Sequence, residues 1–168
     1  KPTERPEGVS LLSDIKIKSK PIRSNKSASV WDIGDGVLCL EFHTKMNAID
    51  NEILDTIAWT IDEVPKQNYK ALVIYNEGTN FSAGVNLGLA MFVINVAAWE
   101  MIEKLVIHGQ KTLQSMKFAP FPVVAAPSGL ALGGGCEVLL HADAIEAHAE
   151  TYTGLVEVGV GLIPGWGG

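Results

Sequence analysis

Short apolar runs alternate with longer amphipathic stretches along this chain. Two extended segments, residues 27–34 and 36–44, flank the turn signal Gly34-Asp35-Gly36 and together predict a β-hairpin. Continuous apolar runs at residues 70–75 and 121–126 predict strands that are buried on both faces. The hydrophobic pattern therefore predicts several short strands in a covered sheet.

Helical periodicity appears between these runs. Asp50 is placed to cap a helix whose apolar face carries Ile53, Ile57, Ile61 and Val64. A second amphipathic helix is predicted from Trp99 to about Met116, ending before Pro120. Further along, residues 136–141 are expected to form a helix, residues 144–149 a strand, and the tail a loop. This alternation of strands and helices is typical of the α/β class.

The composition excludes several classes of protein. With 168 residues, of which 47% are hydrophobic and 19% charged, the chain is expected to form one globular domain with a sizeable core. Cys39 and Cys136 have no spacing typical of disulfide frameworks or zinc sites, and the four histidines are too far apart to suggest a metal site. Because we see no membrane-length apolar run and no signal-peptide pattern, we expect a soluble, cytoplasmic protein without a membrane span.

Charge is unevenly distributed along the chain. Residues 1–26 carry seven basic and three acidic side chains, whereas the remainder carries six basic and sixteen acidic ones. An acidic body argues against a nucleic-acid partner. We predict that residues 1–28 form a basic linker or extended arm and that residues 29–168 form the core. The missing initial methionine and the glycine-rich end lead us to expect a piece of a longer protein, truncated at its carboxyl terminus.

The stretch GLALGGGCE, residues 129–137, combines costly glycines with a carboxylate. Glycines at a helix amino end let a ligand approach free N–H groups, which favour negative charge. The phosphate and dinucleotide patterns are both absent, so the remaining candidate is a developing oxyanion held by two converging N–H donors. A second donor is available in the loop at residues 80–87, which also follows a predicted buried strand and has the small residues Ala83 and Gly84 at its turn.

Two carboxylates lie in apolar surroundings. Glu137 follows Gly134 by three residues, so a helix that begins there brings both to one face. Glu157 lies in the apolar run LVEVGV. Apolar neighbours disfavour the charged form of an acid and move its pKa toward the range useful for proton transfer. The two acids form either an acid/base pair in one pocket or solvated residues on exposed faces.

Four segments carry a family resemblance: KMNAID at 45–50, NFSAG at 80–84, ALGGGCE at 131–137 and EVGVGLIPGWGG at 157–168. Over residues 29–168 the chain resembles the crotonase family, the enoyl-CoA hydratases and isomerases. The resemblance implies the α/β crotonase-like ββα spiral (ClpP/crotonase fold), here expected without its carboxyl-terminal helices. It also implies a homo-oligomer, usually a trimer.

The resemblance implies a role for each matching position. The backbone N–H groups of Ala83 and Gly134 would hold the thioester carbonyl of an acyl-CoA substrate. Glu137 and Glu157 would be the catalytic acids of a hydratase, which adds water to 2-enoyl-CoA thioesters in fatty-acid β-oxidation. The coenzyme A path would follow Lys45, Met46 and Ala48. This chemistry requires no metal and no cofactor, since coenzyme A is part of the substrate.

Two positions depart from the family pattern, and the basic residues 1–28, the head of the chain, suggest a longer, multifunctional protein. Asn86 stands where aspartate is common, and Trp166 stands where a small residue is usual. The basic head resembles the connector of multifunctional β-oxidation proteins that contain a 3-hydroxyacyl-CoA dehydrogenase, and NAD is expected only with such a domain.

Other functions stay open at this point. The enzymatic alternatives are double-bond isomerisation and thioester hydrolysis, and a non-catalytic acyl-CoA-binding module is an alternative from another class. A serine hydrolase built on Ser82 with His108 or His141 is disfavoured, because NFSAG lacks the G-x-S-x-G elbow.

Overall fold

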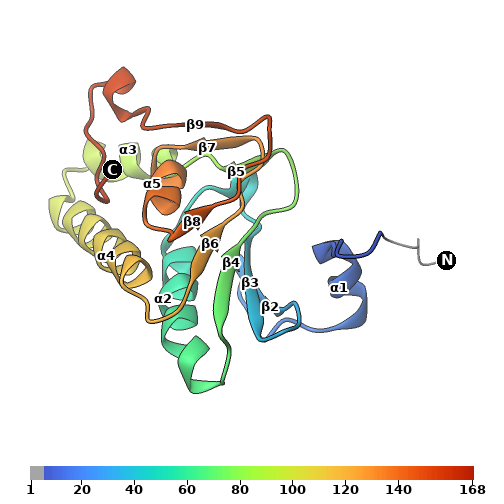
Figure 1. Ribbon diagram of the computed structural model, residues 1–168. Helices are drawn as coiled ribbons and strands as arrows, with labels where there is room; N and C mark the ends of the chain where they lie inside the picture. The colour runs from blue at the N-terminus through green and yellow to red at the C-terminus, as the bar shows by residue number, and fades with distance from the viewer. Residues whose placement is uncertain (1–5) are drawn as a thin grey trace.

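A six-stranded sheet and a three-stranded sheet organise the molecule. The computed structural model describes residues 6–168, apart from the side chains of Leu87 and Leu89. The larger sheet has the strand order β1-β2-β3-β4-β6-β8 and the smaller one the order β5-β7-β9 (Figure 1). The strands are β1 (Arg23–Ser24), β2 (Ala28–Asp32), β3 (Val37–Phe42), β4 (Ala71–Ile74), β5 (Asn80–Ser82), β6 (Val123–Ala125), β7 (Leu130–Leu132), β8 (Ala144–Ile145) and β9 (Tyr152–Gly154). The helices are α1 (Leu12–Lys18), α2 (Asn51–Lys66), α3 (Leu87–Asn95), α4 (Trp99–Lys117) and α5 (Gly134–Leu140), with short 3₁₀ helices η1 (Lys45–Asn47) and η2 (Glu157–Val160).

The larger sheet confirms the predicted hairpin and the strands predicted from the two apolar runs, but not the burial of those strands on both faces. β2 and β3 pair antiparallel, and the turn between them has positive φ at Gly34, Asp35 and Gly36. β4, β6 and β8 then continue the sheet in parallel with β3. Leu72 and Val123 are fully buried and pair in register, whereas the alternate residues Val73 and Val124 are half-buried, so the second face of these strands is less covered than predicted.

Helix α2 confirms the prediction of a capped amphipathic helix. The Asp50 carboxylate accepts a hydrogen bond from the Ile53 amide at 2.9 Å, which satisfies a free donor of the first turn. The predicted apolar face is buried in the main core, and α4 packs beside α2 on the same side of the sheet (Figure 1). α4 spans almost the predicted range.

The smaller sheet was not predicted. β5 lies inside the expected loop at residues 76–86, and β7 lies just before the glycine run. Asn76 joins the two sheets: its Oδ1 accepts the Phe42 amide and its Nδ2 donates to the Phe81 carbonyl, both at 2.6 Å. Only 1% of Asn76 is exposed, so this side chain ties the end of β3 to β5 inside the core.

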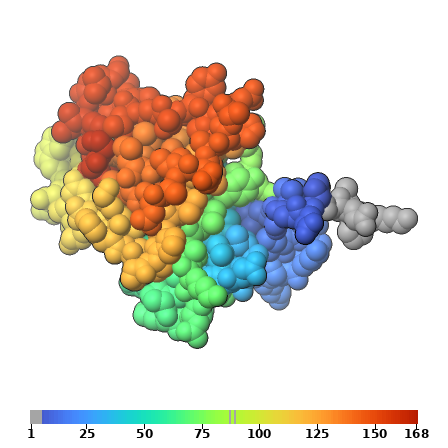
Figure 2. Space-filling view, viewed as in Figure 1, coloured from blue at the N-terminus to red at the C-terminus, as the bar shows by residue number. Residues whose placement is uncertain are grey.

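The predicted extended arm is partly folded, which corrects that prediction. Residues 1–5 lie outside the described residues, but α1 forms a helix and β1 pairs with β2. Leu12 of α1 is buried against Trp31 and Cys39, whose side chains alternate with those facing α2 and therefore lie on the other face of the sheet. In Figures 1 and 2, α1 stands beside β2 and β3, away from the other helices. The predicted domain boundary near residue 28 stays a prediction.

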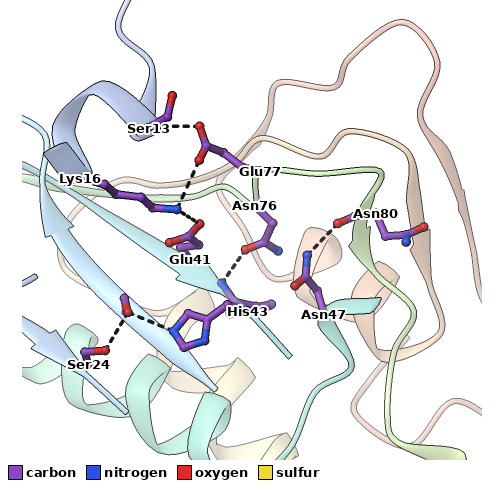
Figure 3. A network of polar contacts seen from close by, with 11 residues as sticks. Ser13, Lys16, Ser24, Glu41, His43, Asn47, Asn76, Glu77 and Asn80 are labelled. Atoms are coloured by element: carbon purple, nitrogen blue, oxygen red, sulfur yellow. Dashed lines mark hydrogen bonds and ion pairs between the residues drawn. The ribbon is translucent and has the colours of Figure 1, made fainter. Parts of the chain in front are cut away.

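A polar network fixes α1 to the sheet (Figure 3). Lys16 forms ion pairs with Glu41 of β3 and with Glu77, the latter at 3.3 Å. Glu77 also accepts the amide of Ser13 at 3.0 Å. The Glu41 side chain is only 7% exposed, so Lys16 neutralises a nearly buried carboxylate.

Within residues 6–168, none of the helices combines the length and the hydropathy that crossing a membrane requires.

Candidate functional site

The glycine run opens α5, and close approach of neighbouring segments explains it. Gly133 has φ +52°, and a Cβ atom there would lie 2.7 Å from Oε1 of Glu157. At Gly135 a Cβ atom would lie 2.6 Å from the Ser82 carbonyl oxygen. Both distances are shorter than real Cβ contacts allow. The glycines therefore let Glu157 and the end of β5 lie directly against the start of α5.

The loop after β5 lies beside the first residue of α5. A Cβ atom at Gly84 would be 3.0 Å from the Gly134 nitrogen, so the segment containing Ala83 adjoins the helix end. Gly134 is the first residue of α5, and an N–H at that position has no intrahelical acceptor. The Ala83 amide, in contrast, donates to the Met46 carbonyl at 3.1 Å. The structure thus brings the two predicted donors together and engages one of them within the chain.

Glu137 is held rigidly inside this site. It is 2% exposed, and its Oε1 accepts the amides of Trp166 at 2.7 Å and Gly168 at 3.1 Å. Burial raises the pKa of Glu137, the two main-chain hydrogen bonds oppose that shift, and the nearby charge of Glu157 adds to it. Glu137 is therefore not a solvated surface residue, and sequence reasoning missed the tail amides that hold it.

Glu157 lies on the other side of Gly133. It begins η2 and is half-buried, with Oε1 directed at Gly133. Its Oε2 is buried and has no hydrogen-bond partner among the described residues. Buried polar atoms are nearly always satisfied, so a buried carboxylate oxygen without a partner is typical of a place where a proton, water or substrate binds. The two predicted acids share one neighbourhood.

The segment matched to the coenzyme A path lies next to the Ala83 loop. Lys45 and Met46 are exposed in η1, and Ala48 follows as its C-cap residue. Met46 and Asn47 both have positive φ, of 57° and 52°, which is uncommon for residues with a side chain. This bent backbone directs the Met46 carbonyl to Ala83.

An apolar cavity of about 490 Å³ opens between the start of α2 and the helices α3 and α4. Its apolar lining includes Ile49, Val85, Ala90, Val93, Ile102 and Leu105. Val85 also faces the site, because its Cγ2 lies 3.4 Å from the position of a Cβ atom on Gly134. Val85 therefore contacts both the cavity and the amide end of α5. The sequence did not predict α3, which forms one wall.

The serine-hydrolase alternative is not supported. The buried Ser82 hydroxyl hydrogen-bonds to main-chain groups. His108 pairs with Asp55 at 3.1 Å, and Nδ1 of His141 lies 2.7 Å from the Glu137 carbonyl oxygen. Neither histidine is the partner of Ser82. In the described part of the chain, no group of three His, Cys, Asp or Glu side chains could hold a metal ion.

Sequence comparison links residues 32–168 to the family described as enoyl-CoA hydratase/isomerase. Over 157 residues, 94% of the chain, it is 43% identical to a Bacillus subtilis protein named as a 3-hydroxyacyl-CoA dehydrogenase. Over 155 residues, 92% of the chain, it is 37% identical to a Rickettsia felis protein named as a fatty acid oxidation complex trifunctional enzyme. The chain spans only 20% and 21% of the lengths of these relatives.

Comparison with solved structures gives the same picture. A protein described as an enoyl-CoA hydratase/isomerase (crotonase) from Legionella pneumophila superposes with a TM-score of 0.74 at 28% identity, over 83% of this chain and 55% of that one. The enoyl-CoA hydratase of Bacillus anthracis also gives 0.74, at 25% identity, over 84% of this chain and 55% of the other. The predicted fold is confirmed.

Proposed function

The chain belongs to the enoyl-CoA hydratase/isomerase, or crotonase, family, and on that premise we propose that it hydrates 2-enoyl-CoA thioesters. One observation carries this proposal. Two glutamates flank Gly133: Glu137 is buried with Oε1 bound by two amides, and Glu157 has a buried oxygen without a partner among the described residues. A site with two acids and adjacent main-chain donors suits the addition of water to an activated double bond.

The thioester carbonyl would bind at the amides of Gly134 and Ala83. For this the Ala83 N–H changes its acceptor from the Met46 carbonyl to the thioester oxygen, which exchanges one hydrogen bond for another. The gain comes in the transition state, because the oxygen then carries developing negative charge and main-chain donors stabilise it more strongly. Loss of one such donor typically costs about 2.7–4 kcal/mol.

The acids divide the proton transfers. A water molecule between them gives one proton to Glu137 as its oxygen bonds to the β-carbon, and the double-bond electrons move toward the carbonyl. Glu157 donates a proton to the α-carbon. The proton that Glu137 took from water then passes to Glu157, so that both acids return to their starting states. The protons also balance if Glu157 accepts the proton from water and Glu137 donates a proton to the α-carbon. The raised pKa of Glu137 suits a group that must accept a proton.

The acyl chain and the pantetheine arm of the substrate would bind to surfaces on either side of the thioester. The acyl chain would enter the apolar cavity at Val85, and the pantetheine arm would run along Lys45, Met46 and Ala48, which adjoin the Ala83 loop. Apolar lining suits an acyl chain, whereas the exposed Lys45 suits the phosphates of coenzyme A.

Activity with 2-butenoyl-CoA tests the proposal. Hydration removes the ultraviolet absorbance of the conjugated thioester, whereas isomerisation of a 3-enoyl-CoA to the conjugated form raises it. Glu137→Gln and Glu157→Gln should each lower kcat about 10²- to 10⁴-fold while the variants stay folded, as circular dichroism checks. Glu150→Gln, at an exposed position, is the matched control and should retain activity. Full hydration by either site variant would remove that acid from the mechanism.

The wider context is also a proposal. The names of the relatives support a place within a multifunctional β-oxidation protein, in which NAD would serve a separate dehydrogenase domain. Exposed apolar side chains support assembly of several copies; they include Phe92, Val96, Trp99, Val158 and Ile163. Light scattering of the full-length protein should give a trimer mass, and a monomer at micromolar concentration would contradict this.

A further inference from the structure

Trp166 is buried between two glycines that belong to different helices. It is 3% exposed. A Cβ atom at Gly109 of α4 would lie 2.1 Å from Nε1 of the indole, and one at Gly134 would lie 2.9 Å from Cζ3. The pyrrole side of the indole thus lies on α4 and its benzene side lies on the first residue of α5. Neither contact leaves room for a side chain at the glycine.

The backbone around Trp166 is anchored on both sides. The Gly165 carbonyl accepts a hydrogen bond from Nε2 of Gln110 on α4 at 2.8 Å, and the Trp166 amide donates to Glu137. Figure 2 shows the carboxyl-terminal segment against α4. The indole is therefore held in one place relative to the acid that we assign to catalysis.

The indole lies close to residues that line the apolar cavity, although it does not line the cavity itself. Leu105, which lines that cavity, precedes Gly109 by one helical turn and lies on the same face of α4. Val85, another lining residue, contacts the same Cβ position of Gly134 as the indole does. A substrate whose carbonyl oxygen binds the Gly134 amide would therefore have its α-carbon next to the benzene ring of Trp166.

We propose that Trp166 is a specificity-determining residue that excludes acyl groups carrying a methyl branch at the α-carbon while admitting straight chains. This inference rests on the proposed function, since it places the thioester at Gly134. A rigid, buried ring leaves no volume beside the α-carbon, whereas the straight chain continues past Val85 into the cavity. A misfit of one methyl group typically changes discrimination about 10- to 200-fold.

Binding of two saturated thioesters tests the inference without requiring turnover. The dissociation constants of butanoyl-CoA and 2-methylpropanoyl-CoA are measured by calorimetry for the full-length protein and for Trp166→Ala and Trp166→Phe. The unmodified protein should prefer the straight chain by about 10- to 200-fold. Trp166→Ala should abolish most of this preference by improving binding of the branched thioester, and Trp166→Phe should reduce it partly.

The outcomes separate this inference from the proposed function. Equal affinity for the two thioesters in the unmodified protein, or an unchanged preference in the variants, overturns the role of Trp166 even if 2-butenoyl-CoA is hydrated. Absence of binding by either thioester, together with absence of hydration, overturns the acyl-CoA site itself and this inference with it. Circular dichroism checks folding, and if Trp166→Ala does not fold, the preference of Trp166→Phe decides.

Discussion

Replacing Asn76 with alanine should weaken the connection between the two sheets and lower the free energy of unfolding more than an exposed substitution in the same region does. The change removes both hydrogen bonds that the side chain makes, so the Phe42 amide and the Phe81 carbonyl lose their partner in the core. An unsatisfied buried group costs about 1–3 kcal/mol, which gives about 2–6 kcal/mol for two. Because water can enter the space left by the amide, we expect about 3 kcal/mol of lost stability, or roughly 6–12 °C in melting temperature.

Urea unfolding followed by circular dichroism measures this effect. The slope of the unfolding free energy against urea should stay the same while the midpoint falls. Asn80→Ala is the matched control, because among the described residues the Asn80 side-chain amide donates a hydrogen bond to the exposed Thr79 hydroxyl alone, at 3.3 Å. We expect its loss to stay within about 0.5 kcal/mol. If Asn76→Ala and Asn80→Ala are equally stable, the bridge between the sheets does not contribute as we infer.

Three further predictions concern ionisable groups. Lys16→Gln leaves the nearly buried Glu41 carboxylate without its cation and should lower the free energy of unfolding by about 1.5–3 kcal/mol in urea. Lys18→Gln, on the exposed side of α1, is the control and should change it very little. Equal losses of stability in the two variants would contradict the network. Because burial raises the pKa of Glu137 in the folded state, its protonated form stabilises the fold at low pH, and that stability is lost as the pH rises through the raised pKa. Glu137→Gln should therefore gain stability relative to the unmodified protein between about pH 4 and about pH 8 in thermal melts, and a constant difference would refute this. Burial raises the pKa of Cys39 to about 12, so iodoacetamide at about pH 8 should label Cys39 only after unfolding, as mass spectrometry can detect; labelling of the native protein would disprove its inertness.

The sequence predicted the strands marked by an apolar run or a turn signal, and the helices whose pattern extends over many residues. α2 and α4 have 16 and 19 residues, long enough for apolar periodicity to identify them. β5, β7 and β9 have three residues each, too few to show alternation. α3 was missed because its residues are apolar almost all round, so no polar face marks it as amphipathic. The short α1 lies in a basic segment whose composition favours a solvated arm.

In the site too, the sequence predicted features that depend on local spacing and missed those that depend on distant contacts. The helical position of Glu137 one turn after Gly134 follows from their spacing, so the sequence alone predicted that they lie together. The amides of Trp166 and Gly168 on Glu137, and the Met46 carbonyl on Ala83, join segments 29–37 residues apart in the chain. Such contacts depend on how the whole fold closes, and no local pattern reveals them.

The parallel pairing of β3, β4 and β6 determines when the ribosome-bound chain can begin to close. Val37 pairs with Ala71, and Leu72 in turn pairs with Val123, 51 residues later. At about 5–20 residues per second, a newly made β4 waits roughly 3–10 s for the strand that covers its second edge. During synthesis this apolar edge is open to pairing with other nascent chains, so production of the protein should depend on chaperones and should fall when translation between these two strands is slowed.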